Sequence, residues 1–260
     1  MRRSTKSWLA AGLLVPAVVT GLAISGIGTA NAIANGELVP EGSYTFSVKL
    51  TMTGIPTAAG GKRNSACSGA LIAPQWVITA GHCFRDQNNV RVERPVADLT
   101  TATVGRADLT GTGGHEATVI AVRQSPTADV SLAKIDTPIT DIEPIGLSET
   151  APEIGAVVRL TGYGSVTSVN PVPETRLRTG QMTVVSLSSS VTGMTGYAPQ
   201  PDTTPCPYDS GGPFFLESED GPLLVSVVSN GPSCPHSTVE SSARTDNITE
   251  WISSSIAETY

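Results

Sequence analysis

The sequence predicts an all-β fold, a sandwich or a barrel, that ends in one α-helix. Short apolar or alternating runs recur along the chain, and Gly, Pro, Asn and Asp residues separate them. Runs of this length and spacing are typical of antiparallel β-strands. After residue 32, no apolar periodicity of helical length appears until the end of the chain. The 260 residues include 26 glycines and 19 prolines, which supply the turns that such a fold needs.

The first 32 residues have the three parts of a secretory signal peptide. The start is basic and contains Arg2, Arg3 and Lys6. Residues 9–24 are uncharged and mostly apolar, and the tripeptide Ala-Asn-Ala at residues 30–32 forms a cleavage site. A membrane anchor is the alternative, but glycine and proline interrupt the apolar run. We expect residues 1–32 to be removed, so that a secreted, extracellular chain begins at Ile33.

The strands are expected where short runs are rich in β-branched and aromatic residues. Five are well marked: residues 44–50, 76–79, 117–122, 157–161 and 223–228. The acidic, proline-rich segment 136–153 is expected to link two halves of a domain spanning residues 33–260. The N-terminal half covers about residues 33–140, and the C-terminal half covers about residues 150–260.

The last element is expected to be an amphipathic helix. Its apolar face has helical spacing and consists of Ile248, Trp251, Ile252, Ser255 and Ile256. Asn247, followed three residues later by Glu250, predicts the N-cap of this helix.

Charge and cysteine content exclude several classes of protein. The formal net charge is −7, and it becomes −10 without the first 32 residues, which carry three basic and no acidic side chains. An acidic chain without a second long apolar run predicts neither a nucleic-acid nor a membrane partner. Four cysteines in a secreted chain predict two disulfides, and their number alone leaves three pairings open.

Two short segments carry the candidate chemistry. Residues 79–83 are Thr-Ala-Gly-His-Cys, and residues 206–213 are Cys-Pro-Tyr-Asp-Ser-Gly-Gly-Pro. A serine hydroxyl becomes an effective nucleophile when a positioned imidazole takes its proton. Both segments resemble the chymotrypsin/trypsin family of secreted serine proteases, which has T-A-A-H-C and G-D-S-G-G-P at these places. The resemblance spans residues 33–260 and implies two antiparallel Greek-key β-barrels with a C-terminal α-helix.

The resemblance implies a catalytic triad at the junction of the barrels. His82 is the expected base and Ser210 the expected nucleophile. Asp129 precedes an apolar run similar to the family's D-I-A-L-L-K-L, so it is the expected orienting carboxylate; Asp108 and Asp136 are the alternatives. The order His, Asp, Ser along the chain fits this family and differs from that of α/β-hydrolases.

Two further roles follow from the resemblance. The oxyanion hole is expected to use the backbone N–H groups of Ser210 and Tyr208, although the family has glycine at the latter position. Asp209 is expected to pair with the amine of Ile33, which signal-peptide cleavage would itself create. Gly81 stands where the family usually has alanine.

The expected specificity pocket departs from the trypsin pattern. Trypsins have an acidic residue at the position of Thr204, so a preference for arginine or lysine is not supported there. Ser229 and Gly231 are expected at the pocket wall. Glu240 falls where the family has a glycine, and it could receive a cation, fill the pocket or lie in solvent on a shifted loop. His236 has no motif around it and is expected on the surface.

The resemblance also selects the disulfide pairs Cys67–Cys83 and Cys206–Cys234. No cofactor or metal is expected, because the loop that includes Asp86 offers too few oxygen ligands for calcium. The predicted function is therefore that of a monomeric, secreted serine endopeptidase, with protein or peptide substrates and a protein inhibitor as a further partner. The alternatives are an esterase that uses the same triad and a catalytically impaired binding protein.

Overall fold

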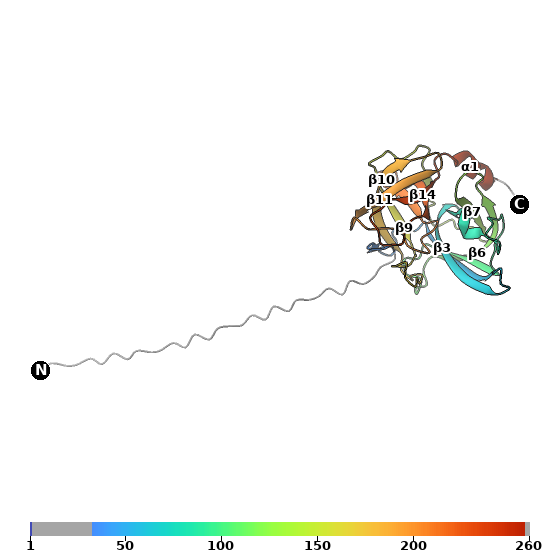
Figure 1. Ribbon diagram of the computed structural model, residues 1–260, viewed down its shortest axis with the longest axis horizontal. Helices are drawn as coiled ribbons and strands as arrows, with labels where there is room; N and C mark the ends of the chain where they lie inside the picture. The colour runs from blue at the N-terminus through green and yellow to red at the C-terminus, as the bar shows by residue number, and fades with distance from the viewer. Residues whose placement is uncertain (2–32, 258–260) are drawn as a thin grey trace.

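The computed structural model describes Met1 and residues 33–257. The expected signal peptide therefore lies outside the described residues, apart from Met1. The described chain forms two β-barrels that lie side by side, with one α-helix at the end of the chain (Figure 1). In Figure 1 the first barrel is coloured cyan to green and the second yellow to orange.

The first barrel contains six antiparallel strands in the order β2-β3-β4-β7-β6-β5, and β5 pairs with β2 to close it. These strands are β2 (Ser47–Pro56), β3 (Lys62–Ala73), β4 (Trp76–Ala80), β5 (Leu99–Val104), β6 (His115–Gln124) and β7 (Val130–Ile135). Consecutive strands β2, β3 and β4 pair in sequence, and the next strand returns beside the first. This arrangement is a Greek key.

The second barrel repeats this topology. Its order is β10-β11-β14-β13-β12-β9, and β9 pairs with β10 to close it. Its strands are β9 (Val157–Gly162), β10 (Arg178–Leu187), β11 (Val191–Ala198), β12 (Pro213–Leu216), β13 (Leu223–Asn230) and β14 (Glu240–Arg244). The predicted all-β fold with two antiparallel Greek-key barrels is therefore confirmed.

Two short strands lie outside the barrel cycles. Strand β1 (Glu37–Leu38) pairs with β10, so the segment after Ile33 joins the sheet of the second barrel although it precedes the first. The expected linker, residues 136–153, contains β8 (Gly146–Leu147), which pairs in parallel with β13. Both ends of the first barrel are thus tied to the second.

The C-terminal helix α1 (Thr249–Ala257) confirms the predicted apolar face. Ile248 and Ile252 are buried and join the core of the first barrel, so the helix covers that barrel although it follows the second. The Asn247 side chain does not cap the helix as predicted. It donates a hydrogen bond to the carbonyl of Ser189 instead.

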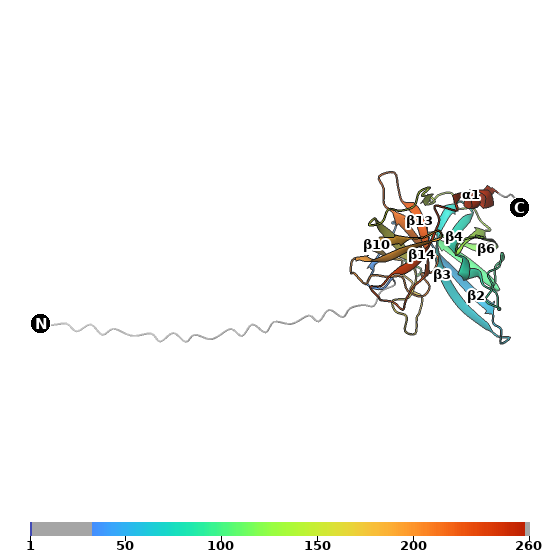
Figure 2. The same cartoon turned by 45° about the horizontal axis from the view of Figure 1, so that its top comes forward.

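Aromatic and aliphatic side chains fill the cores and the junction between the barrels. Each strand of a closed barrel buries its inward-facing residues, and this explains the alternating burial along β6. Strand β7, which lies between β4 and β6, is almost wholly buried. At the junction, Phe215 of the second barrel meets Tyr44 and Phe46, with ring centroids 5.4 and 5.3 Å apart. Figure 2 shows β4 and β13 meeting at this boundary.

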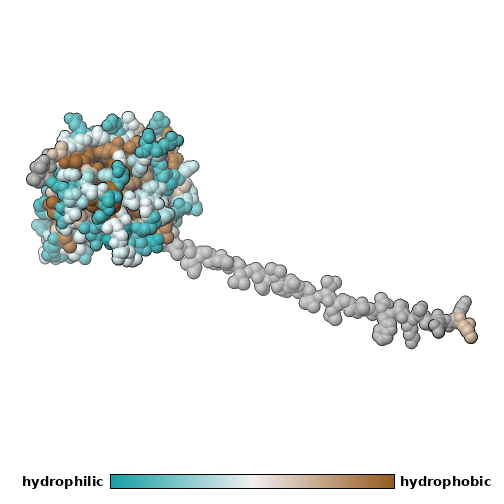
Figure 3. Space-filling view, turned by 180° about the vertical axis from the view of Figure 1, so that it is seen from behind, coloured by the Kyte–Doolittle hydropathy of each residue, from teal (hydrophilic) through white to brown (hydrophobic). Residues whose placement is uncertain are grey.

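The surface is predominantly polar. Seen from behind, most of the face is hydrophilic and the hydrophobic residues form limited patches (Figure 3). Within the described residues, no helix has both the length and the apolar character needed to cross a membrane.

Candidate active site

His82 and Asp129 lie in direct contact at the edge of the first barrel. His82 belongs to a short 3-10 helix, η1 (Gly81–Phe84), that follows β4, and Asp129 immediately precedes β7. Because β4 and β7 are paired, their adjoining ends bring the two residues together. The Asp129 carboxylate lies 2.7 Å from His82 Nδ1 and also accepts a hydrogen bond from the His82 backbone N–H at 2.9 Å.

The surroundings keep Asp129 ionised. Burial alone would raise the pKa of Asp129, but the hydrogen bond and charge of His82 and a hydrogen bond from Ser229 Oγ lower it to about 2. An ionised carboxylate can only accept hydrogen bonds, so the neutral imidazole carries its proton on Nδ1. His82 Nε2 is therefore left with a free lone pair, as a general base requires.

Ser210 lies on the loop before β12 and faces the same cavity as His82. The loop is fixed by backbone hydrogen bonds from Ser68 N–H to the Ser210 carbonyl, at 2.9 Å, and from Gly211 N–H to the Val228 carbonyl, at 2.8 Å. His82 and Ser210 both line a cavity of about 280 Å³. Among the described residues, Ser210 Oγ makes no hydrogen bond. The serine and His82 therefore face one cavity without a hydrogen bond between them.

Tyr208 keeps the backbone conformation that favours glycine. Its φ angle is +77°, in the left-handed region, which costs a residue other than glycine about 1–2 kcal/mol. Ser68 Oγ donates a hydrogen bond to the Tyr208 carbonyl at 3.1 Å and helps to hold this peptide in place. Within the described part of the chain, the N–H groups of Tyr208 and Ser210 have no protein acceptor. Both donors are thus free to bind an anionic oxygen.

Asp209 lies fully buried beneath this loop, next to the backbone nitrogen of Ile33. Its carboxylate accepts hydrogen bonds from the N–H groups of Gly164, at 2.7 Å, and Cys206, at 2.9 Å, and also from Ile33. Burial raises the pKa of Asp209 to about 6, against the effect of these hydrogen bonds and of the charge on Lys49. Ile33 itself is 0% exposed and belongs to the core of the second barrel.

A second cavity, of about 330 Å³, lies beside Ser210. Ser229, Gly231 and Glu240 line it, as expected, but Thr204 does not. The Thr204 side chain is fully buried, and its backbone pairs with Ala34 behind the cavity wall. Counting back from the serine predicts Thr204 at this cavity, whereas the residues that line it begin at Pro205 on this segment.

His236 corrects a second expectation, because it does not lie on the surface. Only 8% of its side chain is exposed, and its Nε2 lies 3.2 Å from Glu240 Oε2. Glu240 is itself buried, so the interpretation of Glu240 as a solvated residue on a shifted loop is also wrong. No sequence motif indicates this pair, because it depends on how the loop between Cys234 and β14 folds.

Arg91 is a contact of the site that the sequence motifs do not identify. Its guanidinium donates hydrogen bonds to the carbonyls of Ala128, at 2.8 Å, and Ser125, at 3.4 Å, and lies 3.8 Å from Asp129 Oδ1. It occupies the space beside Gly81, where a Cβ atom would lie 2.5 Å from Arg91 Nη1. The only sequence feature that indicates this contact is Gly81 itself, which stands where the family usually has alanine and leaves room for the Arg91 side chain.

We expect Gly81→Ala to displace Arg91 and to destabilise the protein by about 1–3 kcal/mol, the usual cost of overpacking. Thermal unfolding of four proteins would measure this: the unchanged chain, Gly81→Ala, Arg91→Ala and the double variant. The cost of Gly81→Ala should fall by at least half when Arg91 is absent. Equal costs in both backgrounds would contradict the coupling between these residues.

The two predicted disulfides are both present. Cys67–Cys83 connects β3 to the helix that carries His82. Cys206–Cys234 connects the Ser210 loop to the loop that lines the second cavity. Each bridge therefore restrains one of the two segments that carry His82 and Ser210. Among the described residues, no group of three or more His, Cys, Asp or Glu side chains could hold a metal ion.

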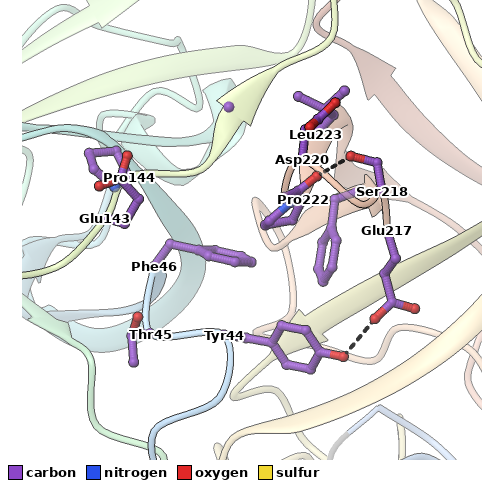
Figure 4. A pocket seen from close by; sticks show the side chains of 13 residues that line it. Tyr44, Thr45, Phe46, Glu143, Pro144, Glu217, Ser218, Asp220, Pro222 and Leu223 are labelled. Atoms are coloured by element: carbon purple, nitrogen blue, oxygen red, sulfur yellow. Dashed lines mark hydrogen bonds between the residues drawn. The ribbon is translucent and has the colours of Figure 1, made fainter.

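A cavity larger than these two, of about 480 Å³, lies elsewhere (Figure 4). It shares no lining residue with the two cavities that include Ser210. Its walls include the aromatic rings of Tyr44 and Phe46, and Tyr44 donates a hydrogen bond to Glu217 at 2.9 Å. Glu217 also pairs with Arg159 at 3.0 Å, which leaves no unpaired charge on that side chain.

Comparisons with known proteins agree with this geometry. A family model described as Trypsin matches residues 33–252. The chain is 30% identical over 210 residues to a "Beta-fibrinogenase-like" protein of Daboia siamensis, covering 74% of this chain and 78% of that protein. It is 28% identical over 253 residues to a "Trypsin-like protease" of Streptomyces glaucescens, covering 90% of this chain and 86% of that protein. It is also 28% identical over 171 residues to "Thrombin-like enzyme acutin" of Deinagkistrodon acutus, covering 59% of this chain and 70% of that protein.

Proposed function

Because this chain belongs to the trypsin family and is a serine-type endopeptidase, we propose that it cleaves peptide bonds with a triad of His82, Asp129 and Ser210. The mechanism is the acyl-enzyme mechanism that serves as the general template for such triads, so it enters here by family membership. Substrates are proteins or peptides, and the protein acts after secretion.

In the first half of the reaction, Ser210 Oγ attacks the carbonyl carbon of the scissile peptide, and His82 Nε2 takes the hydroxyl proton. The C=O bond becomes a C–O⁻ bond, and the N–H groups of Tyr208 and Ser210 bind this oxygen. His82 then gives its proton to the amine nitrogen as the C–N bond breaks. An ester between Ser210 and the acyl half of the substrate remains.

In the second half, a water molecule replaces the amine. His82 Nε2 takes one proton of the water as its oxygen attacks the ester carbon, and the same two N–H groups bind the oxygen. When the bond to Ser210 Oγ breaks, the proton returns to that oxygen. The carboxylic acid leaves, and the site regains its starting state. Asp129 stabilises the imidazolium in both halves without itself becoming protonated.

One observation carries this proposal: the hydrogen-bonding environment of His82. Asp129 Oδ2 at 2.7 Å from Nδ1 holds the proton on that nitrogen and directs the lone pair of Nε2 away from the barrel. The nitrogen that is free to act as a base belongs to a side chain that shares a cavity with Ser210. Neither a binding protein nor a structural protein needs this arrangement.

Covalent labelling with a fluorophosphonate tests the proposal directly, because the reagent reacts only with an activated serine. We expect one label on the purified mature protein and none on Ser210→Ala, a change that removes only the hydroxyl. Matched amide and ester substrates then separate a peptidase from an esterase. A folded, mature protein that takes no label would contradict the triad assignment.

We also propose that maturation is a single cleavage after residue 32. It would convert the backbone nitrogen of Ile33 into an amine at the place where its N–H already meets Asp209. N-terminal sequencing of the secreted protein tests this proposal, with Ile33 as the expected first residue.

A further inference from the structure

The wall of the cavity beside Ser210 contains an acid and a base that face each other. Glu240 Oε2 lies 3.2 Å from His236 Nε2, and the two side chains are only 3% and 8% exposed. Glu240 lines the cavity together with Ser210. Its carboxyl group lies against Gly231, where a Cβ atom would be only 1.7 Å from Glu240 Oε2. A carboxyl group therefore forms part of the surface that a substrate side chain would meet.

The hydrogen bonds of His236 fix where its protons lie. Nδ1 is 3.1 Å from the carbonyl oxygen of Thr238, which can only accept, and 3.2 Å from the Thr238 hydroxyl, which can accept or donate. A proton on Nδ1 satisfies both contacts, whereas a bare Nδ1 would leave the carbonyl without a donor. In the neutral ring, Nε2 is then an acceptor that faces a carboxyl oxygen. Two acceptors at 3.2 Å need a proton between them. The contact therefore requires one shared proton, either on Glu240 or on His236.

The electrostatic surroundings favour retention of that proton. Burial raises the pKa of Glu240 to about 8, and the nearby charge of Asp209, on the Ser210 loop, adds to the effect. Burial lowers the pKa of His236, against its hydrogen bond to Thr238. Both shifts disfavour separated charges in the cavity wall. At neutral pH the pair therefore holds one proton and has no net charge.

We propose that the His236–Glu240 pair is a proton-coupled cation site, at which binding of a cationic group releases the shared proton and leaves His236 neutral and Glu240 ionised. This inference rests on the proposed function, since the cation would be the arginine or lysine side chain of a substrate. The proton leaves to solvent, and an N–H group of the cation takes its place as the donor between His236 Nε2 and the new carboxylate. No other covalent bond changes.

A specificity that depends on pH follows from this coupling. Below the pH at which the free pair loses its proton, affinity for a cation should rise about tenfold per pH unit, because each binding event releases one proton. An uncharged substrate side chain binds without proton release and should show no such rise. One pocket would thus accept apolar side chains at low pH and cationic ones at higher pH.

Binding of benzamidine, a flat aromatic cation, tests the site without any catalytic turnover. Calorimetric titration at pH 7 in phosphate and in Tris, which differ in protonation enthalpy, gives the number of protons released. We expect about one proton per benzamidinium for the unchanged mature protein. Glu240→Gln should release none and bind at least tenfold more weakly. His236→Gln should still bind benzamidine but release fewer protons at pH 7, because its amide can donate to the carboxylate and so lowers the pKa that burial raises.

His115→Gln is the matched control, because His115 pairs with Asp141 at 2.8 Å on the exposed surface. It should leave both affinity and proton release unchanged. The proposal is overturned if benzamidine does not bind between pH 6 and 9, if it binds without proton release, or if Glu240→Gln releases the same number of protons. Fluorophosphonate labelling of the same samples separates the two proposals: labelling without proton release rejects the cation site alone, and proton release without labelling rejects the triad alone.

Discussion

Asp129→Asn is expected to lower kcat by about 10⁴-fold, the size of the effect that the corresponding change has in proteases with this triad. The fold should survive, because the side chain keeps its shape. The loss has a specific cause in this chain: Asp129 accepts hydrogen bonds and donates none. His82 Nδ1, the His82 backbone N–H and Ser229 Oγ all donate to it.

An asparagine in this place cannot satisfy all of these donors. If its oxygen faces the His82 backbone N–H, its NH₂ group faces Nδ1 and forces the proton of the imidazole onto Nε2. That nitrogen then has no lone pair with which to accept the proton of Ser210. If the amide is reversed, two N–H groups oppose each other at the His82 backbone.

Steady-state kinetics on one peptide substrate, with far-ultraviolet circular dichroism as a check of folding, measures this effect. Asp136→Asn is the matched control, because Asp136 accepts a hydrogen bond from the Thr118 N–H on the surface, away from His82. It should retain activity within about threefold, as surface changes usually do. A folded Asp129→Asn protein with nearly full activity would reject the assigned carboxylate.

A chain with one extra residue before Ile33 is expected to lose activity by about 10²- to 10³-fold. The extension replaces a charged amine at Asp209 by a neutral amide. Breaking a buried charge pair in this way costs about 3–5 kcal/mol. The loss of this pair destabilises the Ser210 loop, because Asp209 lies between Tyr208 and Ser210, whose N–H groups are the proposed oxyanion donors.

The pH dependence of stability identifies the cause. With an amide at Ile33, burial raises the pKa of Asp209 to about 6. The folded protein then binds a proton that the unfolded chain has already lost, so stability falls as pH rises from about 4 to about 6. The loss amounts to roughly 3 kcal/mol. In the mature chain the amine of Ile33 lowers the pKa of Asp209, so the decrease in stability between pH 4 and pH 6 should disappear.

Thermal unfolding and activity of the two forms between pH 4 and 8 provide the measurement. A mature chain with Ile33→Val is the control, because it keeps both the amine and an apolar side chain. It should behave like the unchanged mature protein. An extended chain with full activity would refute the role assigned to the amine of Ile33.

Local patterns were sufficient to predict most of the fold. Strand predictions succeeded where a run of apolar residues coincides with a single strand, as at residues 76–79 and β4. The first run, residues 44–50, was placed too early, because Tyr44 has φ +48° and lies in a turn before β2 begins at Ser47. A positive φ at a tyrosine leaves no trace in the sequence pattern.

The site was less predictable where it depends on contacts between distant segments. Counting along the chain predicts both Glu240 and Thr204 at the cavity; Glu240 lines it, whereas the Thr204 side chain is fully buried on a segment that pairs with Ala34, far away in sequence. His236 could not be assigned for the same reason. Its environment arises from the fold of a loop, and single residues in loops carry no periodic signal.

The contact between Ile33 and Asp209 joins two residues that are synthesised at very different times, and this affects when the site can form during folding. Ile33 is synthesised early, whereas its neighbour Asp209 and strand β10, which pairs with the segment after Ile33, are made much later. Contacts of such large sequence separation form slowly. His82 and Asp129 can meet once β4 and β7 have paired, but a chain halted before residue 206 lacks both Ser210 and Asp209, the carboxylate beside Ile33. Under the proposed mechanism, the residue whose amine pairs with Asp209 is made early and its partner is made late, so hydrolysis begins only after the loop that carries Asp209 and Ser210 has folded.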